Sequence, residues 1–205
     1  MAKTLAYLLD GKIYINLTNR CTNSCIFCLR NDKDDVCGKN MWLENESFTA
    51  SEVIEQIEKF PLSEEITFCG YGEPLLKLDL LKEIAVYLKK TYPNIKLRIN
   101  TNGHANFVHN KDVAQELTGL IDTISVSLNG CCEEEYDRLS QPSFKNAYNE
   151  VKNFIKSCSN AGINTIATVV DGYKSQRLNI EECERIATEL GAKFRVREWI
   201  ENGYS

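Results

Sequence analysis

The stretch Lys96-Leu-Arg-Ile-Asn-Thr-Asn102 alternates apolar and polar side chains and is followed by Gly103. Alternation over so short a run is typical of a β-strand whose two faces meet different surroundings. We therefore predict a strand at Lys96–Asn100. Five further runs with β-branched residues are predicted strands: Lys12–Leu17, Glu65–Cys69, Thr123–Leu128, Asn164–Val170 and Lys193–Trp199.

Amphipathic segments between these runs are predicted helices: Thr49–Phe60, Asp79–Thr91, Asn110–Leu120, Phe144–Cys158 and Ile180–Leu190. Repeated strand–helix units predict a parallel sheet with right-handed crossovers. Six units are too few for an eight-stranded barrel. If the apolar strand faces meet the helices, the inner face is polar. The predicted fold is α/β, an open partial (β/α)6 TIM-like barrel with parallel strands, in a single domain over residues 1–205.

The composition is that of a globular protein, with 43% hydrophobic residues among 205 and a net charge of −5. An acidic balance disfavours nucleic acid as a partner, because phosphate neutralisation supplies most of such affinity. There is no membrane-length apolar run and no export signal, so we expect a cytoplasmic protein without a membrane partner. The nine cysteines then indicate metal binding, reactive thiols or burial rather than disulfides.

Three cysteines directly follow the first predicted strand in the pattern Cys21-x3-Cys25-x-Phe27-Cys28. Thiolates this close in sequence can converge on one soft metal centre. Zinc would require a fourth protein ligand, and no paired Cys or His motif follows nearby. A four-iron cluster held by three cysteines would keep one iron open for another ligand.

This pattern resembles the hallmark of radical S-adenosylmethionine (SAM) enzymes. The resemblance implies a [4Fe-4S] cluster on Cys21, Cys25 and Cys28, whose open iron chelates SAM. One electron from the reduced cluster would cleave SAM to a 5′-deoxyadenosyl radical. It also implies an oxygen-sensitive enzyme served by an electron donor such as flavodoxin or ferredoxin.

Further motifs resemble the SAM-binding elements of that superfamily. Gly70-Tyr-Gly-Glu-Pro74 resembles the Gly-Gly-Glu-Pro element, in which Glu73 would pair with the SAM ammonium group. Asn100-Thr-Asn102 and Ser125-Val-Ser-Leu-Asn129 resemble strand ends that border the ligand. The full set of implied cofactor-binding residues is Phe27, Gly70, Tyr71, Gly72, Glu73, Pro74, Asn100, Asn102, Ser125, Ser127, Asn129, Arg138, Thr168, Val170, Arg195, Arg197 and Trp199.

The roles of the other cysteines, of His104 and of Arg138 are less clearly indicated by the sequence. Cys158 and Cys183 lie on apolar helix stripes and are predicted core residues. Cys69 is expected to point inward, as either a small packing residue or a reactive thiol, and Cys37 lies in a charged loop with no indicated role. The pair Cys131 and Cys132 is either a substrate-site thiol pair or without function. His104 is a candidate general acid–base, against a loop histidine bonded to backbone. Arg138 holds the SAM carboxylate or forms a surface ion pair.

The resulting hypothesis is a single-cluster enzyme that abstracts hydrogen from an unidentified substrate, with proteins and peptides among the candidates. The alternatives are an activating enzyme for a glycyl-radical protein and a non-catalytic iron–sulfur module. The chain ends soon after the last strand, so we expect a large substrate or a partner to close the site. At subfamily level, Phe68-Cys-Gly-Tyr-Gly-Glu-Pro74 and the closing Phe194-Arg-Val-Arg-Glu198 resemble the small TatD-associated radical SAM proteins.

Overall fold

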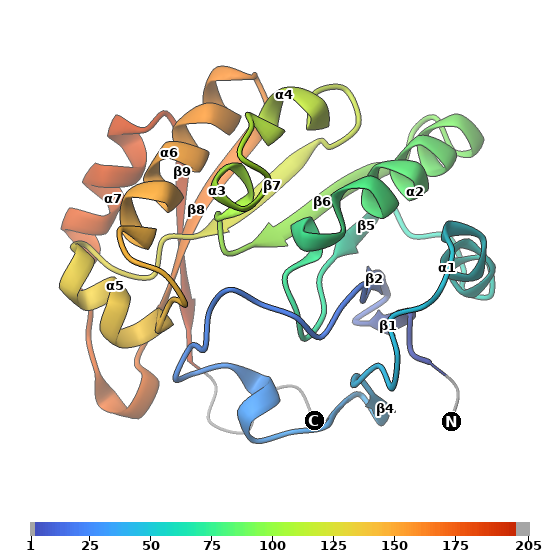
Figure 1. Ribbon diagram of the computed structural model, residues 1–205, viewed down its shortest axis with the longest axis horizontal. Helices are drawn as coiled ribbons and strands as arrows, with labels where there is room; N and C mark the ends of the chain where they lie inside the picture. The colour runs from blue at the N-terminus through green and yellow to red at the C-terminus, as the bar shows by residue number, and fades with distance from the viewer. Residues whose placement is uncertain (1–2, 200–205) are drawn as a thin grey trace.

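A computed structural model describes residues 3–199, whose main feature is a curved sheet of seven strands (Figure 1). The strand order is β1 (Ala6–Leu9), β2 (Lys12–Ile15), β5 (Glu65–Phe68), β6 (Lys96–Thr101), β7 (Thr123–Ser127), β8 (Asn164–Asp171) and β9 (Lys193–Glu198). In this sheet the strands from β2 through β9 are parallel to one another. β1 pairs with β2 in the antiparallel direction and forms one edge of the sheet. β1 does not pair with β9, so the predicted open α/β sheet is confirmed.

The helices lie along the outer side of the sheet (Figure 1). They are α1 (Ala50–Ile57), α2 (Leu78–Thr91), α3 (Ala105–His109), α4 (Val113–Leu117), α5 (Glu133–Ser140), α6 (Ala147–Asn160) and α7 (Ile180–Glu189), with short 3₁₀ turns at Leu29–Asn31, Pro74–Lys77 and Tyr173–Ser175. Thr49 and Glu52 cap α1 reciprocally, as the Thr-x-x-Glu spacing predicts.

Two predicted helices have different limits in the structure. Within the predicted Asn110–Leu120 only α4 is helical, because Asp112 caps it and Asn110, with a left-handed φ of 49°, ends the preceding helix α3 at His109. The helix predicted to start at Phe144 starts at Ala147, because Asn146 also has a left-handed φ of 64°. A left-handed residue interrupts the helical hydrogen-bond pattern.

The core lies between the sheet and the helices, where the outward strand residues are fully buried. Ile66, Phe68, Leu97, Ile99 and Ile124 each have 0% exposure. Their alternating neighbours form the inner face of the sheet, which carries Thr67, Cys69, Arg98, Asn100, Ser125, Ser127 and Thr168. The polar inner face is therefore present as the alternation predicts.

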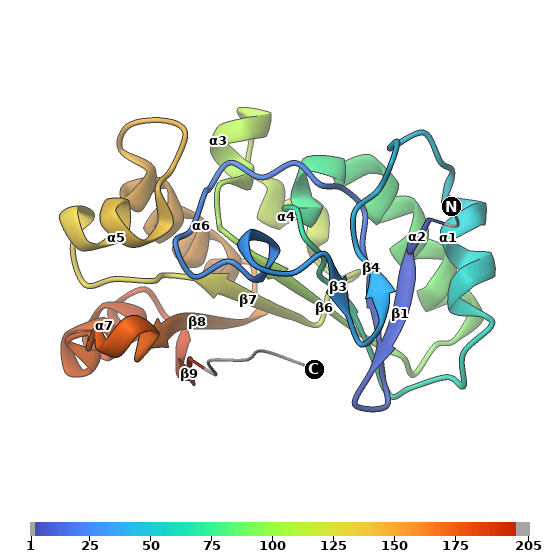
Figure 2. The same cartoon turned by 90° about the horizontal axis from the view of Figure 1, so that it is seen from below.

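A second small core lies at the β1 edge and contains Tyr7, Val36, Met41 and Tyr71. Val36 and Met41 come from the short hairpin of β3 (Asp35–Val36) and β4 (Lys39–Asn40) and from the residue that follows it. From below, the segment between β2 and α1 extends from this hairpin to α5 (Figure 2). Within residues 3–199, no helix has the length and apolar character needed to cross a lipid bilayer.

Candidate cluster and cofactor site

The loop that carries the three cysteines begins at the carboxyl end of β2, where one glutamate holds its first residues. The Glu46 carboxylate accepts hydrogen bonds from the Thr18 hydroxyl and the Asn19 N–H, both at 2.8 Å. The Asn19 side chain in turn exchanges two hydrogen bonds with the backbone of Leu43. The entry to the cysteine loop is therefore fixed before Cys21.

Arg30 connects the two ends of the cysteine loop to the glycine motif. Its guanidinium donates to the carbonyl oxygens of Asn19 at 3.0 Å, Asn23 at 3.2 Å and Tyr71 at 3.3 Å. The Tyr71 hydroxyl donates to the Lys33 carbonyl at 2.6 Å. The interposed tyrosine of the Gly-Tyr-Gly-Glu-Pro motif thus anchors the segment that follows the cysteines.

The glycine motif needs its glycines because it passes directly under the cysteine loop. A Cβ on Gly72 would lie 2.3 Å from the Thr18 carbonyl oxygen and 2.5 Å from that of Arg20. A Cβ on Gly70 would lie 2.1 Å from Asn16 Oδ1. The Glu73 N–H also donates to Arg20 O at 2.8 Å, so the backbone of the glycine motif is in direct contact with the backbone of the cysteine loop.

Glu73 is 4% exposed, and both of its carboxylate oxygens accept hydrogen bonds from the protein. The donors are Leu75 N–H at 3.0 Å, the Thr101 hydroxyl at 2.8 Å and Asn102 N–H at 2.7 Å. Burial raises the pKa of Glu73 to about 7, against the lowering effect of these three bonds. This carboxylate joins the glycine motif to the end of β6.

The residues after β6 reach the cysteine loop through side chains. Asn102 Nδ2 donates to Thr22 Oγ1 at 2.7 Å and to Cys21 Sγ at 3.6 Å, while its Oδ1 accepts from His104 N–H at 3.1 Å. The His104 ring bonds Thr22 Oγ1 through Nδ1 and the Tyr136 hydroxyl through Nε2, both at 2.8 Å. Asn102, Thr22, His104 and Tyr136 form a continuous chain, which we call the Asn102 relay.

His104 is therefore a buried connector, 1% exposed, and burial lowers its pKa to about 4. The expectation of a loop histidine bonded to backbone is wrong, because both ring nitrogens bond side chains. Two hydroxyl groups fall at the right distance on opposite sides of the ring, which sequence spacing does not show.

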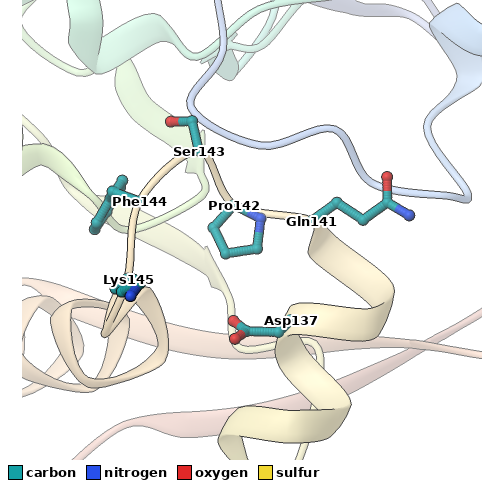
Figure 3. A pocket seen from close by; sticks show the side chains of 6 residues that line it. All are labelled: Asp137, Gln141, Pro142, Ser143, Phe144 and Lys145. Atoms are coloured by element: carbon teal, nitrogen blue, oxygen red, sulfur yellow. The ribbon is translucent and has the colours of Figure 1, made fainter.

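The far side of the cysteine loop rests on the segment between α5 and α6. Ser24 N–H donates to Ser140 O and Ser143 N–H donates to Thr22 O, while Asn23 pairs with Pro142. Figure 3 shows Pro142 and Ser143 beside the cysteine loop, lining a surface cavity of about 360 Å³ with Asp137, Gln141, Phe144 and Lys145. The residues lining this cavity include none from the inner face of the sheet.

The three cysteines are free thiols and partly exposed. Burial raises the pKa of Cys25 to about 12, and the charges of Cys28 and Cys21 add to this effect because the three are near neighbours. Burial also raises the pKa of Cys21, against the lowering effects of Asn23 N–H, Arg30 and Asn102. Metal binding at such thiols requires proton release.

The donor set fits an iron–sulfur cluster better than a single metal ion. Among residues 3–199, no three His, Cys, Asp or Glu side chains are gathered as one ion would require. In a four-iron cluster each cysteine binds a different iron, so the thiolates surround the cluster from one loop. Cys21, Cys25 and Cys28 lie on one loop and are partly exposed, and the Asn102 amide already donates to one of them.

The inner face beside the cysteine loop also fits a polar ligand. Asn100 and Asn129, near the carboxyl ends of β6 and β7, each have a buried Oδ1 atom without a hydrogen-bond partner among residues 3–199. Buried amide oxygens are ordinarily satisfied, so both can accept a bond from a ligand. Ser127 aligns with Thr168, which aligns with Arg195, and Val170 aligns with Arg197 on the next strand. The strand-end residues predicted to border SAM therefore share one face.

The remaining predicted residues occupy more peripheral positions. Phe27 packs edge-on against Tyr173, which packs edge-on against Trp199, so aromatic rings connect the cysteine loop to the end of β9. Arg138 is half exposed on α5, bonds Gln176 and lies 4.0 Å from Glu135. Pro74 is buried at the start of a 3₁₀ turn, where its fixed φ suits the first helical position.

The other cysteines have different surroundings. Cys158 and Cys183 are fully buried on α6 and α7, which confirms them as core residues. Cys69 lies on the inner face, where burial raises its pKa and the Asn100 side chain and Arg197 lower it. Cys131 N–H donates to Glu135, and burial raises the pKa of the Cys131 thiol to about 11. Cys132 is exposed as the N-cap of α5.

Sequence reasoning missed Thr22, Arg30, Tyr136 and Tyr173, which hold the site together. Thr22 lies within the cysteine motif and Arg30 lies two residues after it, and that proximity is the one signal that could have indicated them. Tyr136 and Tyr173 lie far from the motif in the sequence and reach the site only in the folded chain.

A model of the radical SAM superfamily matches residues 15–190, which is most of the chain. The chain belongs to the radical SAM superfamily. This family implies a [4Fe-4S] cluster and SAM as cofactors, and its members need a reductant.

Two uncharacterized proteins of Methanocaldococcus jannaschii are similar to this radical SAM chain in sequence. MJ0804 is 28% identical over 177 residues, covering 86% of this chain and 52% of the relative. MJ0907 is 28% identical over 125 residues, covering 60% of this chain and 41% of the relative. The chain therefore spans about half the length of the curated relatives it matches.

Solved structures share the fold at low sequence identity. Streptococcus suis SuiB bound to S-adenosylmethionine has a TM-score of 0.65 and 18% identity, over 93% of this chain and 41% of SuiB. Native anSMEcpe with bound AdoMet has a TM-score of 0.65 and 13% identity, over 94% of this chain and 54% of anSMEcpe. The radical SAM partial barrel is thus the fold of this chain.

Proposed function

We propose that this chain is a radical SAM enzyme that binds a [4Fe-4S] cluster through Cys21, Cys25 and Cys28 and abstracts hydrogen from a peptide or protein substrate. One observation carries the proposal. The three-cysteine loop lies across the carboxyl ends of β2, β5 and β6, held there by Arg30, Glu73 and the Asn102 relay. In barrel enzymes this end of the sheet is where active sites are built.

When bound, the reduced cluster supplies the electron that cleaves SAM to methionine and a 5′-deoxyadenosyl radical. The chain's own residues position these groups. We propose that the peptide oxygens at Gly70 and Gly72 accept from the SAM amine, together with the Oδ1 atoms of Asn100 and Asn129, which have no partner among the described residues. Glu73 fixes the end of β6 beside these acceptors. We propose that its carboxylate also contacts the ammonium group of SAM.

Arg195 and Arg197 are proposed to hold a carboxylate of SAM or substrate. Both lie on β9, in register with Thr168 and Val170 of β8. Ser125, Ser127 and Thr168 offer hydroxyl groups on the same inner face. Arginine suits this role because its guanidinium pairs with carboxylates in bidentate geometry.

A peptide substrate is favoured over a nucleic acid by the net charge of −5. It is also supported by two structural relatives, since SuiB is described bound to the precursor peptide SuiA and anSMEcpe bound to a peptide. We propose a flavodoxin- or ferredoxin-type protein as the reductant, residues 1–205 as one core domain, and the TatD-associated proteins as the subgroup. That subgroup's name specifies no reaction.

The test begins with anaerobic reconstitution of the purified chain. We expect about four irons per chain and, with dithionite and SAM, formation of 5′-deoxyadenosine measured by mass spectrometry. Cys25→Ser should lose most of the iron, whereas Cys37→Ser, which changes an exposed cysteine on the hairpin, should keep it.

Two results would contradict the proposal in different ways. Full iron without 5′-deoxyadenosine would favour the non-catalytic iron–sulfur module. Full iron in Cys25→Ser would refute the ligand assignment. Deuterium transfer into 5′-deoxyadenosine from labelled peptides, absent with labelled RNA, would establish the substrate class.

A further inference from the structure

The side chain of Asn102 is bonded at both of its ends. An asparagine amide has two hydrogens on Nδ2 and one acceptor oxygen. The two Nδ2 bonds go to Thr22 Oγ1 and Cys21 Sγ, and Oδ1 accepts from His104 N–H. The group is also 7% exposed, so water does not compete strongly for these bonds.

The backbone of Asn102 is fixed independently of its side chain. Its N–H donates to Glu73 Oε2 at 2.7 Å, and the adjacent Gly103 N–H donates to Thr101 Oγ1 at 3.1 Å. A Cβ on Gly103 would lie 2.8 Å from a Val126 methyl group, and Gly103 has a φ of +83°. Only glycine fits this turn easily, and the turn sets the direction of the Asn102 amide.

The acceptors of the amide are held from the other side. His104 bonds Thr22 through one ring nitrogen and Tyr136 through the other, and Asn23 Nδ2 donates to the same Tyr136 hydroxyl at 3.1 Å. Tyr136 has 0% exposure on α5. The two residues that follow Cys21, Thr22 and Asn23, are thus tied to α5 and to the end of β6.

We propose that Asn102 is a positioning residue that donates a hydrogen bond to the Cys21 ligand of the cluster and raises the cluster's reduction potential. Hydrogen bonds to cluster sulfurs are one of the factors that set these potentials. An N–H dipole aimed at a thiolate stabilises the added electron, because the reduced cluster carries more negative charge. This role of Asn102 rests on the proposed cluster binding and goes beyond it by naming a residue that shifts the reduction potential of the cluster.

The test compares reduction potentials of reconstituted proteins by redox titration followed by electron paramagnetic resonance. Asn102→Ala should keep its iron, but its equilibrium constant for reduction should fall about tenfold, which corresponds to 59 mV for one electron. Asn102→Asp keeps the size and the acceptor oxygen, replaces the donor with a negative charge, and should lower the potential further. Asn149→Ala, a matched truncation on α6, should have the wild-type potential.

A second readout separates a direct hydrogen bond from a general loosening. Cys21 Sγ also accepts from the Asn23 N–H at 3.4 Å, so proton ENDOR of the reduced wild-type cluster should show two exchangeable couplings. Asn102→Ala should lose one of the two, and Asn149→Ala should keep both. Full iron with an unchanged potential and both couplings in Asn102→Ala would overturn the proposal, while leaving cluster binding intact. If Asn102→Ala loses its iron, Asn102→Asp decides in the same way. A wild-type chain that takes up no cluster would instead refute the proposed function.

Discussion

The backbone N–H of Asn102 donates to the Glu73 carboxylate across 2.7 Å, joining the end of β6 to the glycine motif after β5. The two residues come from neighbouring parallel strands, and each also contacts the cysteine loop: Asn102 at Cys21 and Glu73 at Arg20. Glu73 therefore joins the three sequence motifs of the site, through its carboxylate to the end of β6 and through its backbone N–H to the cysteine loop.

Glu73→Ala should destabilise the cluster-free chain. It leaves the N–H groups of Leu75 and Asn102 and the Thr101 hydroxyl without their acceptor in a buried place. We expect a loss of roughly 3 kcal/mol in the free energy of unfolding, measured by urea denaturation. Glu184→Ala, on the exposed side of α7, should change it by less than about 0.5 kcal/mol. Equal effects of the two variants would contradict this role.

Gly72→Ala should displace the cysteine loop by steric contact alone. Its Cβ would meet two backbone oxygens at 2.3 Å and 2.5 Å, neither of which can rotate away. We expect a loss of about 2 kcal/mol or more in unfolding free energy and reduced iron uptake. Gly119→Ala meets nothing within 4 Å but has a φ of +78°, so it should cost only about 1 kcal/mol and retain iron uptake.

Much of this site could be predicted because its signals are local. The alternation in Lys96–Asn100 shows which side chains face inward, and the spacing of Cys21, Cys25 and Cys28 depends on three residues of one type in one loop. β1 was not predicted, since Ala6–Leu9 is continuously apolar without alternation and pairs antiparallel at the sheet edge. A short apolar run has no period that identifies it as a strand.

The Asn102 relay could not be predicted, for a different reason. Thr22 and His104 are 82 positions apart, and His104 and Tyr136 are 32 apart. Each residue type is common in loops, so nothing local marks them as partners. Their contact follows from the order of strands in the sheet, which brings the ends of β2, β6 and β7 together.

Tyr71→Phe should loosen the segment after the cysteine motif without unfolding the protein. The variant loses the hydroxyl bond to Lys33 O but keeps the ring packed against Trp42. We expect a cost of about 1 kcal/mol, with faster amide hydrogen exchange at Met41, whose N–H bonds Asp34 O. Tyr87→Phe removes a surface hydroxyl bond to Glu58 and should leave exchange at Met41 unchanged. Unchanged exchange in both variants would contradict the anchoring role.

Thiol alkylation should follow burial rather than position in the chain. In the folded, metal-free protein, iodoacetamide should modify the exposed Cys37 and Cys132 first. Cys158 and Cys183 should react only after denaturation, because both are fully buried and burial raises the pKa of each to about 12. Peptide mass mapping over time measures the order. Early labelling of Cys158 would show that α6 does not pack on the sheet as described.

His104 should make stability fall as the pH is lowered from about 6.5 to about 4. In the folded chain burial lowers its pKa to about 4, whereas the unfolded chain takes up the proton near 6.5. Between these values the unfolded state binds more protons, so acidification favours unfolding by up to roughly 3 kcal/mol. Glu73 acts in the opposite direction, because its raised pKa of about 7 makes the folded state bind a proton first on acidification.

Comparison of the wild type with His104→Gln isolates the histidine, because Glu73 is present in both. The difference in unfolding free energy between them should shrink steadily from pH 6.5 to pH 4, as urea denaturation of the cluster-free proteins would measure. A difference that is constant over this range would mean that the pKa of His104 is the same in the folded and unfolded states. The buried chain from Thr22 to Tyr136 would then have to open at acidic pH without cost to the fold, which its 1% exposure argues against.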